Sequence, residues 1–449
     1  MREINNNLFG DCINLEKVLL GDNITKIGYS AFENCQKLRT IIIPESVSEI
    51  MRDAFVGCLS LEEIEVSPNN NSYVSEEGIL YSLYNGEKYG LVMYPPAKTN
   101  KTYKLDSGIY KVDSNAFTYC SYLESIETNG HDHFTSTNGV LFSGNWLIAY
   151  PAGKTDNEYT IPEGVKDIRE GAFRGNINLK KVTISNDVRS IANNAFKDCI
   201  NLETVNLSEN VTDIYSSAFE GCKKLKNINI PSSWSTIPSS LFADCLSLEN
   251  IILPEGVTSI STNAFANCLQ LKNITIPSTV TSIGISPFVN CPCLSKIYVL
   301  CLNASLGLQS LYSRAPDFTI YAHTNSTAKT YADSESINFI SICEDGDNNE
   351  RCDICNSNVD NSVSITLTGT NVSAKNLETD CTLILASYKG NRLVNCKVVT
   401  LTKETKHSYS FDEIEGFVYD KTNVDLIKAF LWNDLNRFIP ICSSASYKY

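Results

Sequence analysis

A phenylalanine that recurs every 23 residues is the most regular feature of the hydrophobic pattern. A leucine follows each of these phenylalanines after six residues and a valine or isoleucine after nine, so a whole apolar pattern is repeated. Two gaps are longer, at 62 and 56 residues, which is one period plus 39 and one period plus 33. A fixed period of this length predicts a repeat protein. The ten anchors are Phe9, Phe32, Phe55, Phe117, Phe173, Phe196, Phe219, Phe242, Phe265 and Phe288.

Each repeat predicts two short strands. An apolar-x-apolar pair such as Ile274 and Ile276 lies nine and eleven residues after the anchor, and in several copies a proline such as Pro277 ends the strand because it has no N–H to donate. A second pair, such as Val280 and Ile283, follows. One unit cannot bury its own apolar face, whereas stacked units share a continuous core. The pattern therefore predicts a mainly β fold, a solenoid of ten 23-residue repeats.

The repeats resemble a known family. Their consensus, Ala-Phe-x-x-Cys-x-x-Leu-x-x-Ile-x-Ile-Pro, is similar to that of the BspA-like leucine-rich repeat proteins, which are abundant on the surfaces of gut and oral bacteria and of some mucosal protozoa. The resemblance covers residues 4 to about 342 and rests on ten anchored copies. It implies a surface-exposed protein with an adhesion or protein-binding role and without catalysis.

Cysteine lies three residues after the anchor in nine of the ten repeats, and Asn176 takes its place in the other one. A small, polarizable side chain on the same face as the phenylalanine suits a packed interior, and free cysteine is among the most buried residue types. We expect a ladder of packed thiols; disulfides and metal or redox chemistry are the alternatives. The nine are Cys12, Cys35, Cys58, Cys120, Cys199, Cys222, Cys245, Cys268 and Cys291.

The positions eight and ten residues after the anchor alternate with the apolar ones, so their side chains point away from the core. In the later repeats most of them are amides or hydroxyls, which suit a polar partner or a glycan but also simply keep a strand soluble. We take these residues as the candidate binding face: Thr204, Asn206, Asn227, Asn229, Asn250, Ile252, Asn273 and Thr275.

Two insertions, at about residues 70–108 and 131–162, fill the long gaps and are copies of each other. Both contain the run aromatic-x-x-x-x-Gly-apolar-Leu-aromatic, and both place an asparagine beside a glycine, which is typical of a two-residue hairpin turn. We therefore expect a β-hairpin in each. Tyr84 and Trp146 join the candidate binding residues as a possible aromatic platform, although hairpins also use such residues for their own packing.

A cap is predicted at the end of the solenoid, which we place at residues 1–343. A strand at 318–321, a short helix at 326–332 and a last strand at 337–342 follow one another here. This order is similar to the usual terminal cap of the family. We place the whole cap at about 316–342.

A polar, acidic stretch at residues 344–362 is predicted to be a linker. It holds a row of oxygen ligands that resembles a calcium loop but lacks the glycine and the distal glutamate of an EF-hand, and a C-x-x-C pair that suits a disulfide or, with more ligands, zinc. A plain linker, calcium, and a disulfide or zinc all stay open. The residues concerned are Asp345, Asp347, Asn349 and Asp353 for calcium, and Cys343, Cys352 and Cys355 for the sulfur site.

The 23-residue period is absent from residues 363–449, where longer strands begin. Their rhythm predicts a small β-sandwich of the Ig-like kind. The segment 427–432 with Leu435 and Pro440 is similar to a C-terminal β-sandwich of clostridial surface proteins, which implies a spacer, stalk or second recognition module. The expected strands are 364–368, 382–388, 394–401, 407–411 and 425–432.

Charge and motifs exclude several functions. The formal net charge is −14, which argues against nucleic acid or anionic lipid as the main ligand. No apolar run is long enough to span a bilayer, and no phosphate-binding, nucleophile-elbow or zinc-protease motif occurs. His131-Asp132-His133 is the one histidine cluster, which we expect to be solvated rather than a metal site. We therefore expect no enzyme, no catalytic residue, no metal and no cofactor.

The sequence thus predicts an extracellular or cell-surface binding protein. We expect a monomer whose partner is a protein on a host or microbial surface. A carbohydrate-binding accessory protein and a cell-wall spacer are the alternatives, so a glycan ligand stays open. Because Ile4 lies inside a repeat that has no cap before it, we expect the native protein to extend further upstream and to carry its export signal there.

Overall fold

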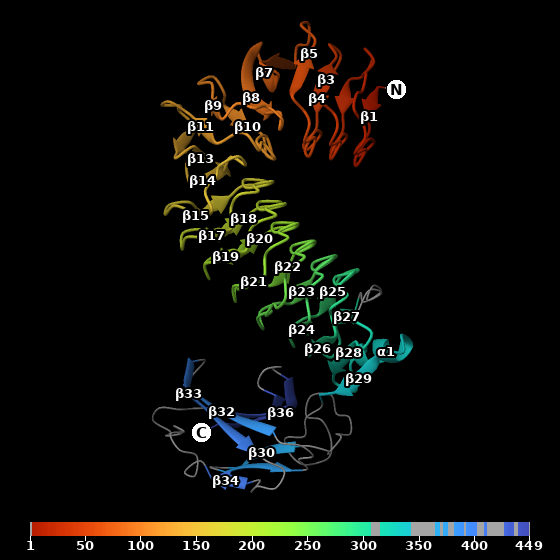
Figure 1. The fold of residues 1–449 in the computed structure, drawn as a ribbon, viewed down its shortest axis with the longest axis vertical. Coiled ribbons are helices and arrows are strands. Elements are labelled where there is room, and N and C mark those ends of the chain that lie inside the picture. Colours follow the sequence, from red (N-terminus) through yellow and green to blue (C-terminus); the bar gives the residue numbers. More distant parts are fainter. Residues whose placement is uncertain are drawn as a thin grey trace. The chain divides into compact units, whose positions relative to one another are not determined.

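The computed structural model describes residues 2–304 and 315–342 in full and, beyond them, the backbone of strands at residues 305–306 and between residues 364 and 448. The chain divides into two units: Met1–Ser295 with Ala304–Pro316, and Lys296–Asn303 with Asp317–Tyr449. The fold is mainly β, a solenoid of stacked leucine-rich coils (Figure 1). In the described residues α1 (Thr327–Ser334) is the single α-helix, and no helix there is long and apolar enough to cross a membrane.

Parallel strands join consecutive coils of the first unit. Each residue pairs with the residue at the same position of the next coil, so that Ile41 lies opposite Ile64 and Val182 lies opposite Val205. The longer strands are β3 (Thr40–Ile43), β5 (Glu63–Val66), β9 (Thr102–Lys104), β11 (Ser125–Glu127), β15 (Glu158–Thr160), β17 (Lys181–Thr183), β19 (Thr204–Asn206), β21 (Asn227–Ile228) and β24 (Asn273–Ile276). The shorter strands are β1 (Glu3–Ile4), β2 (Lys26–Ile27), β4 (Glu49–Ile50), β10 (Lys111–Val112), β16 (Asp167–Ile168), β18 (Ser190–Ile191), β20 (Asp213–Ile214), β22 (Thr236–Ile237), β23 (Ser259–Ile260), β25 (Ser282–Ile283) and β27 (Ser305–Leu306).

The turn that carries the anchor explains the rest of the consensus. In most coils the anchor N–H donates to the carbonyl of the residue before the next anchor, as from Phe32 to Ala54 at 2.8 Å and from Phe219 to Leu241 at 3.1 Å. The residues two positions before and two positions after the anchor have a left-handed backbone conformation, for example Asn194 at φ 57° and Asp198 at φ 59°. Asparagine, aspartate and glycine tolerate this conformation better than other residues, so these types recur there.

Stacked phenylalanine rings form the centre of the core. Seven neighbouring pairs have ring centroids between 4.6 and 5.9 Å apart and planes within 19° of each other. The rings from Phe173 to Phe265 are fully buried. Truncating one of them to alanine would cost about 3–5 kcal/mol of stability, because the coils on both sides hold the cavity open.

The insertions form antiparallel strands, as predicted, but each contains three strands rather than two. The first holds β6 (Tyr73–Glu76), β7 (Ile79–Tyr84) and β8 (Glu87–Met93), and the second holds β12 (Thr135–Thr137), β13 (Val140–Ser143) and β14 (Trp146–Ala149). The last strand of each pairs in parallel with a short strand, β8 with β10 and β14 with β16. Each insertion is therefore joined to the ladder of short strands.

Coils also begin at Tyr94 and Tyr150, near the ends of the insertions. Their N–H groups donate to the carbonyls of Ala116 and Ala172, at 2.9 and 2.7 Å, as the anchor phenylalanines do. The Tyr150 ring stacks on Phe173 with centroids 5.0 Å apart. Tyrosine thus replaces phenylalanine at these two anchors. A repeat pattern defined by phenylalanine alone does not include them.

The second unit contains the predicted strand, helix and strand of the cap. Parallel strands β26 (Lys296–Val299), β28 (Thr319–Ala322) and β29 (Asn338–Ser341) form its sheet. Ser326 caps α1, and its hydroxyl accepts from the N–H of Lys329 at 3.2 Å. A serine at this position satisfies one of the free N–H groups of the first helical turn.

Two antiparallel sheets follow toward the C-terminus. The five expected strands are present, together with β31 and β36, which the sequence pattern did not indicate. That these sheets form an Ig-like sandwich stays a prediction, and the acidic segment 344–362 lies outside the described residues. The sheets are β30 (Ser364–Thr368), β31 (Asn371–Lys375) and β34 (Ser408–Ser410), and β33 (Arg392–Leu401), β32 (Cys381–Lys389), β35 (Leu426–Asp434) and β36 (Ile439–Lys448).

The cysteine ladder has a hydrogen-bonding role besides packing. Each buried ladder thiol donates to the anchor carbonyl of the preceding coil; Cys58 Sγ, for example, lies 3.1 Å from the Phe32 oxygen. Burial raises the pKa of Cys35 to about 11 and that of Cys291 to about 12. Asn176 replaces the thiol with an amide that donates to the carbonyls of Pro151 and Ala152.

Eight of the nine ladder thiols are buried, free cysteines, and Cys12 is exposed. The expectation that all nine are packed is therefore wrong for Cys12, because no coil precedes it in this chain to cover it.

We predict that alkylation with iodoacetamide will discriminate these thiols. Cys12 and the exposed Cys293 should be modified in the native protein, whereas the eight buried thiols should react only after denaturant is added, since alkylation needs the accessible thiolate. Peptide mass spectrometry assigns each site. Native modification of Cys222 or Cys245 at the rate of Cys12 would contradict the packed ladder.

Candidate binding cleft between the two insertions

Turns of coils that are far apart in the sequence meet beside the insertions, all within the first unit. Arg174, 3% exposed, lies 3.4 Å from Glu33 and donates to the Tyr119 hydroxyl at 3.1 Å. That hydroxyl donates to Asp198. Tyr119 has a φ of 61°, which is unusual for a bulky residue and is held here by these contacts. The network ties coils before the insertions to coils after them.

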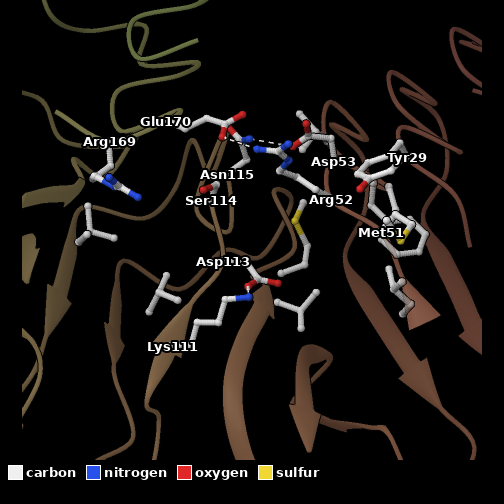
Figure 2. Close-up of a pocket in the computed structure, with 18 of the residues that line it drawn as sticks. Tyr29, Met51, Arg52, Asp53, Lys111, Asp113, Ser114, Asn115, Arg169 and Glu170 are labelled. Atoms are coloured by element: carbon white, nitrogen blue, oxygen red, sulfur yellow. Dashed lines mark hydrogen bonds and ion pairs between the residues drawn. The ribbon is translucent and has the colours of Figure 1, made fainter. Parts of the chain in front are cut away.

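A cleft of about 630 Å³ lies next to this network. The ladder of short strands is interrupted here: β4 does not pair with β8, and β10 does not pair with β14. The ends of these strands and the turns that follow them line the cleft (Figure 2). Each insertion thus opens the ladder and supplies one wall.

Charged groups line one edge of the cleft in pairs. Arg52 Nη1 lies 2.9 Å from Glu170 Oε2, although 118 residues separate them in the sequence. Lys111 and Asp113 form a second pair at 2.6 Å. Figure 2 shows the Arg52, Asp53, Asn115 and Glu170 side chains gathered at this edge.

Asp53 and Asn115 carry the unusual electrostatics of the cleft. Burial, together with the negative charge of Glu170, raises the pKa of Asp53, while Arg174 and the 2.7 Å hydrogen bond from Asn115 Nδ2 oppose this. Asn115 is 4% exposed, and its Oδ1 has no partner in the part of the chain that the structure describes. Gly171, at φ 66°, leaves room for this oxygen, since a Cβ there would lie 1.9 Å from it. The oxygen is thus a buried acceptor without a donor among the described residues.

Three exposed aromatic residues surround the cleft: Tyr29, Tyr110 and Trp146, which are 43%, 56% and 42% exposed. The Arg169 guanidinium lies over the Trp146 ring, 4.7 Å from its centroid. Tyr110 stacks on Tyr89 at 5.4 Å and meets His133 edge-on at 4.5 Å. Much of each ring face is therefore already in contact with the protein.

The candidate residues from the sequence fall on two surfaces. Trp146 lines the cleft, and Tyr84, 65% exposed, is connected to it through ring contacts from Tyr84 to Tyr89 to Tyr110. The eight strand-face residues are all exposed, on the longer-strand side of later coils, although the backbone around Asn250 and Ile252 forms no strand. Asn206 donates to the Thr183 hydroxyl of the preceding coil at 3.4 Å.

The cleft residues that follow the short strands were not predicted from the sequence. They occupy the fourth, third and second positions before the anchor. These positions hold serine, threonine or asparagine in many coils, but Arg52, Asp53, Arg169 and Glu170 beside the insertions. This local increase in charge was a signal that the sequence did contain.

The histidine cluster differs from its prediction at His131, whereas Asp132 and His133 are exposed, as expected. His131 is 7% exposed rather than solvated, its Nδ1 accepts from the His133 N–H at 3.0 Å, and its ring packs on Phe134. Among the described residues no group of three or more histidine, cysteine, aspartate or glutamate side chains is placed to hold a metal ion.

Comparison with known proteins identifies the repeats. The model of the BspA type leucine-rich repeat region matches the chain in six copies, over residues 1–82, 97–151, 152–268, 194–316 and 235–347. No curated protein matches the chain.

Similar solved structures include three bacterial proteins. A leucine-rich repeat protein from Eubacterium ventriosum is 24% identical, with 61% of this chain and 76% of that chain covered and a TM-score of 0.45. A leucine rich cell surface protein from Faecalibacterium prausnitzii is 26% identical, with 66% and 82% covered and a TM-score of 0.38. The pneumococcal vaccine antigen PcpA is 22% identical, with 76% and 77% covered and a TM-score of 0.40.

We predict that Asp53→Asn makes the protein more stable than the wild type, and increasingly so from pH 4 to pH 7. A carboxyl with a raised pKa binds its proton more tightly in the folded state, so its contribution to stability is present at low pH and is lost as the pH rises through that pKa. The asparagine oxygen still accepts from Asn115. Denaturant unfolding at several pH values measures the difference.

Asp106→Asn serves as the control of opposite sign. Hydrogen bonds from Lys88 and from the Gly108 N–H lower the pKa of Asp106, so this variant should be less stable than the wild type at pH 7 and equal to it at acidic pH. A difference between Asp53→Asn and the wild type that does not vary with pH would contradict the raised pKa.

Proposed function

Since this chain belongs to the BspA type leucine-rich repeat family, we propose that it is a non-catalytic binding protein of a bacterial cell surface that recognises a protein partner. Leucine-rich repeat proteins commonly bind proteins, and this family is not generally enzymatic. We place the main contact in the cleft between the insertions, with the strand face from Thr204 to Thr275 as a second, weaker candidate.

The observation that carries this proposal is the combination of side chains in the cleft. Tyrosine, tryptophan and arginine are the residues most enriched at protein interface hot spots, and Tyr110, Trp146 and Arg169 are grouped here. Contacts between distant turns, such as Arg52 with Glu170, hold the walls in place before any partner arrives. A preorganised site loses less entropy on binding.

A glycan partner is the second candidate, because exposed aromatic rings also suit sugars. The ring contacts favour a protein. A sugar packs its apolar face on an open aromatic face, whereas Arg169 lies over Trp146 and Tyr89 stacks on Tyr110. The edges and hydroxyls that remain free suit the mixed polar and apolar contacts of a polypeptide.

The family supports the proposed surface location. We predict that mild trypsin treatment of intact cells expressing the natural gene releases solenoid peptides, while a cytoplasmic marker stays intact. Peptides that appear only after lysis would contradict a surface location.

We predict that binding to arrayed host and microbial surface proteins depends on the cleft. The variant Tyr110→Ala/Trp146→Ala should lower the affinity for a protein hit by about 30-fold, the effect of losing one strong hot spot or two moderate ones. Both side chains are partly exposed, so the fold should persist, which circular dichroism checks.

Asn227→Ala/Asn273→Ala is the matched control on the strand face, where both residues are exposed, and it should keep the affinity. Protein hits that both variants retain, or that only the strand-face variant loses, would contradict the proposed site. Hits on a parallel glycan array that the cleft variant loses would instead favour the carbohydrate-binding alternative.

A further inference from the structure

A second pocket, of about 300 Å³, lies at the base of the first insertion, where the coil that begins at Tyr94 meets β6, β7 and β8. Tyr94, Lys98 and Asn100 line one part of it. The Tyr94 side chain is 1% exposed, and its hydroxyl has no hydrogen-bond partner in the described residues. An unpaired buried hydroxyl costs free energy, so this group lacks a partner that the site has room to supply.

The second insertion shows which partner is missing. Both insertions end in the same run, Tyr-Pro-x-x-Lys-Thr, but the next residue is Asn100 in the first and Asp156 in the second. In the second copy the Tyr150 hydroxyl donates to Asp156 Oδ2 at 3.1 Å, and Lys154 Nζ lies 3.3 Å from the same oxygen. One carboxylate therefore satisfies both the hydroxyl and the ammonium group.

The first copy keeps both donors and lacks the carboxylate. Lys98 matches Lys154, and each ammonium group donates to a backbone carbonyl, of Glu77 and of Asn138. Within residues 2–306, however, Lys98 has no carboxylate at ion-pair distance, whereas Lys154 has Asp156. The pocket is therefore lined by the same two residue types, at matching sequence positions, that hold a carboxylate in the second insertion.

We propose that this pocket binds the carboxylate of a small organic acid, held between the Tyr94 hydroxyl and Lys98 Nζ where Asp156 lies in the second insertion. Hydrogen bonds between an ionised carboxylate and such donors are about twice as strong as neutral ones. The proposal does not depend on a protein partner in the cleft.

The rest of the pocket fits a polar acid of the size of a monosaccharide or an amino acid. The hydroxyls of Tyr81 and Tyr103 lie 3.0 Å apart on its wall, and Lys88 is paired with Glu76 and Asp106. Burial raises the pKa of Tyr94 and of Tyr103, so both keep their protons at neutral pH. The walls thus supply hydroxyls for a polyol, and of the three lysines that line the pocket Lys98 and Lys104 have no ion pair in the part of the chain that the structure describes.

Titration calorimetry with glucuronate, and with glucose as the matched ligand without a carboxylate, tests the proposal on the full chain. We expect one glucuronate per chain and no glucose binding. Crystals soaked in acetate should show the carboxylate between Tyr94 and Lys98. Glucuronate that binds no better than glucose, or a water alone at that position in the acetate soak, would overturn the proposal.

Exchange of the two differing residues gives the sharpest test. Asn100→Asp should fill the site from within the chain, weaken glucuronate binding about tenfold or more and raise the thermal midpoint by about 2 °C, because Tyr94 gains an acceptor. Asp156→Asn should free the Tyr150 hydroxyl and Lys154 in the second insertion, so that the number of glucuronate molecules bound per chain rises from one to two. An Asn100→Asp protein that binds as the wild type does would refute the site.

The variants Lys98→Met and Lys154→Met distinguish glucuronate binding at the first insertion from binding at the second. The first should lose binding about tenfold or more, and the second should leave it unchanged, although both remove the same cation from the same local sequence. Equal effects of the two changes would mean that glucuronate binds elsewhere.

Discussion

The hydrogen bond from an anchor N–H to the carbonyl just before the anchor of the next coil, in most cases an alanine carbonyl, is the interaction on which the solenoid depends. It repeats at 2.7–3.1 Å along the first unit, and it holds only if every turn closes in the same way. The two left-handed residues that flank the anchor provide that closure, so a coil cannot gain or lose a residue in the turn. Growth of the chain is therefore restricted to the ends of the longer strands, where both insertions lie.

The insertions interrupt the ladder of short strands, and the coils resume after each of them. Each adds antiparallel strands and then resumes the coil at a tyrosine, Tyr94 or Tyr150, whose N–H makes the anchor bond. Because the new strands replace a short strand of the ladder, they separate the neighbouring short strands, and a cleft lies between them. The first insertion also lines a second, smaller pocket.

Local features of the fold could be predicted from the sequence, because they depend on short-range periodicity. Strand alternation, the Ser326 cap and the strands of the insertions belong to this class. The cleft could not be predicted, because it rests on contacts such as Arg174 with Glu33, 141 residues apart, whose geometry depends on how the insertions reposition the coils. The burial of His131 also depends on tertiary packing, in which its ring contacts Phe134. Tyr29 and Tyr110 could not be chosen as candidate residues from the sequence, because their place beside the cleft also depends on how distant coils pack.

The cysteine ladder has a consequence for how the protein matures. Each buried thiol is satisfied by a carbonyl of the coil before it and has no need of another sulfur. Secreted repeat proteins often depend on cross-links made by an oxidase, and they misfold when sulfur atoms are joined in the wrong order. The eight buried thiols of this ladder are packed as free cysteines, so the contacts that hold the coils together include no disulfide among them.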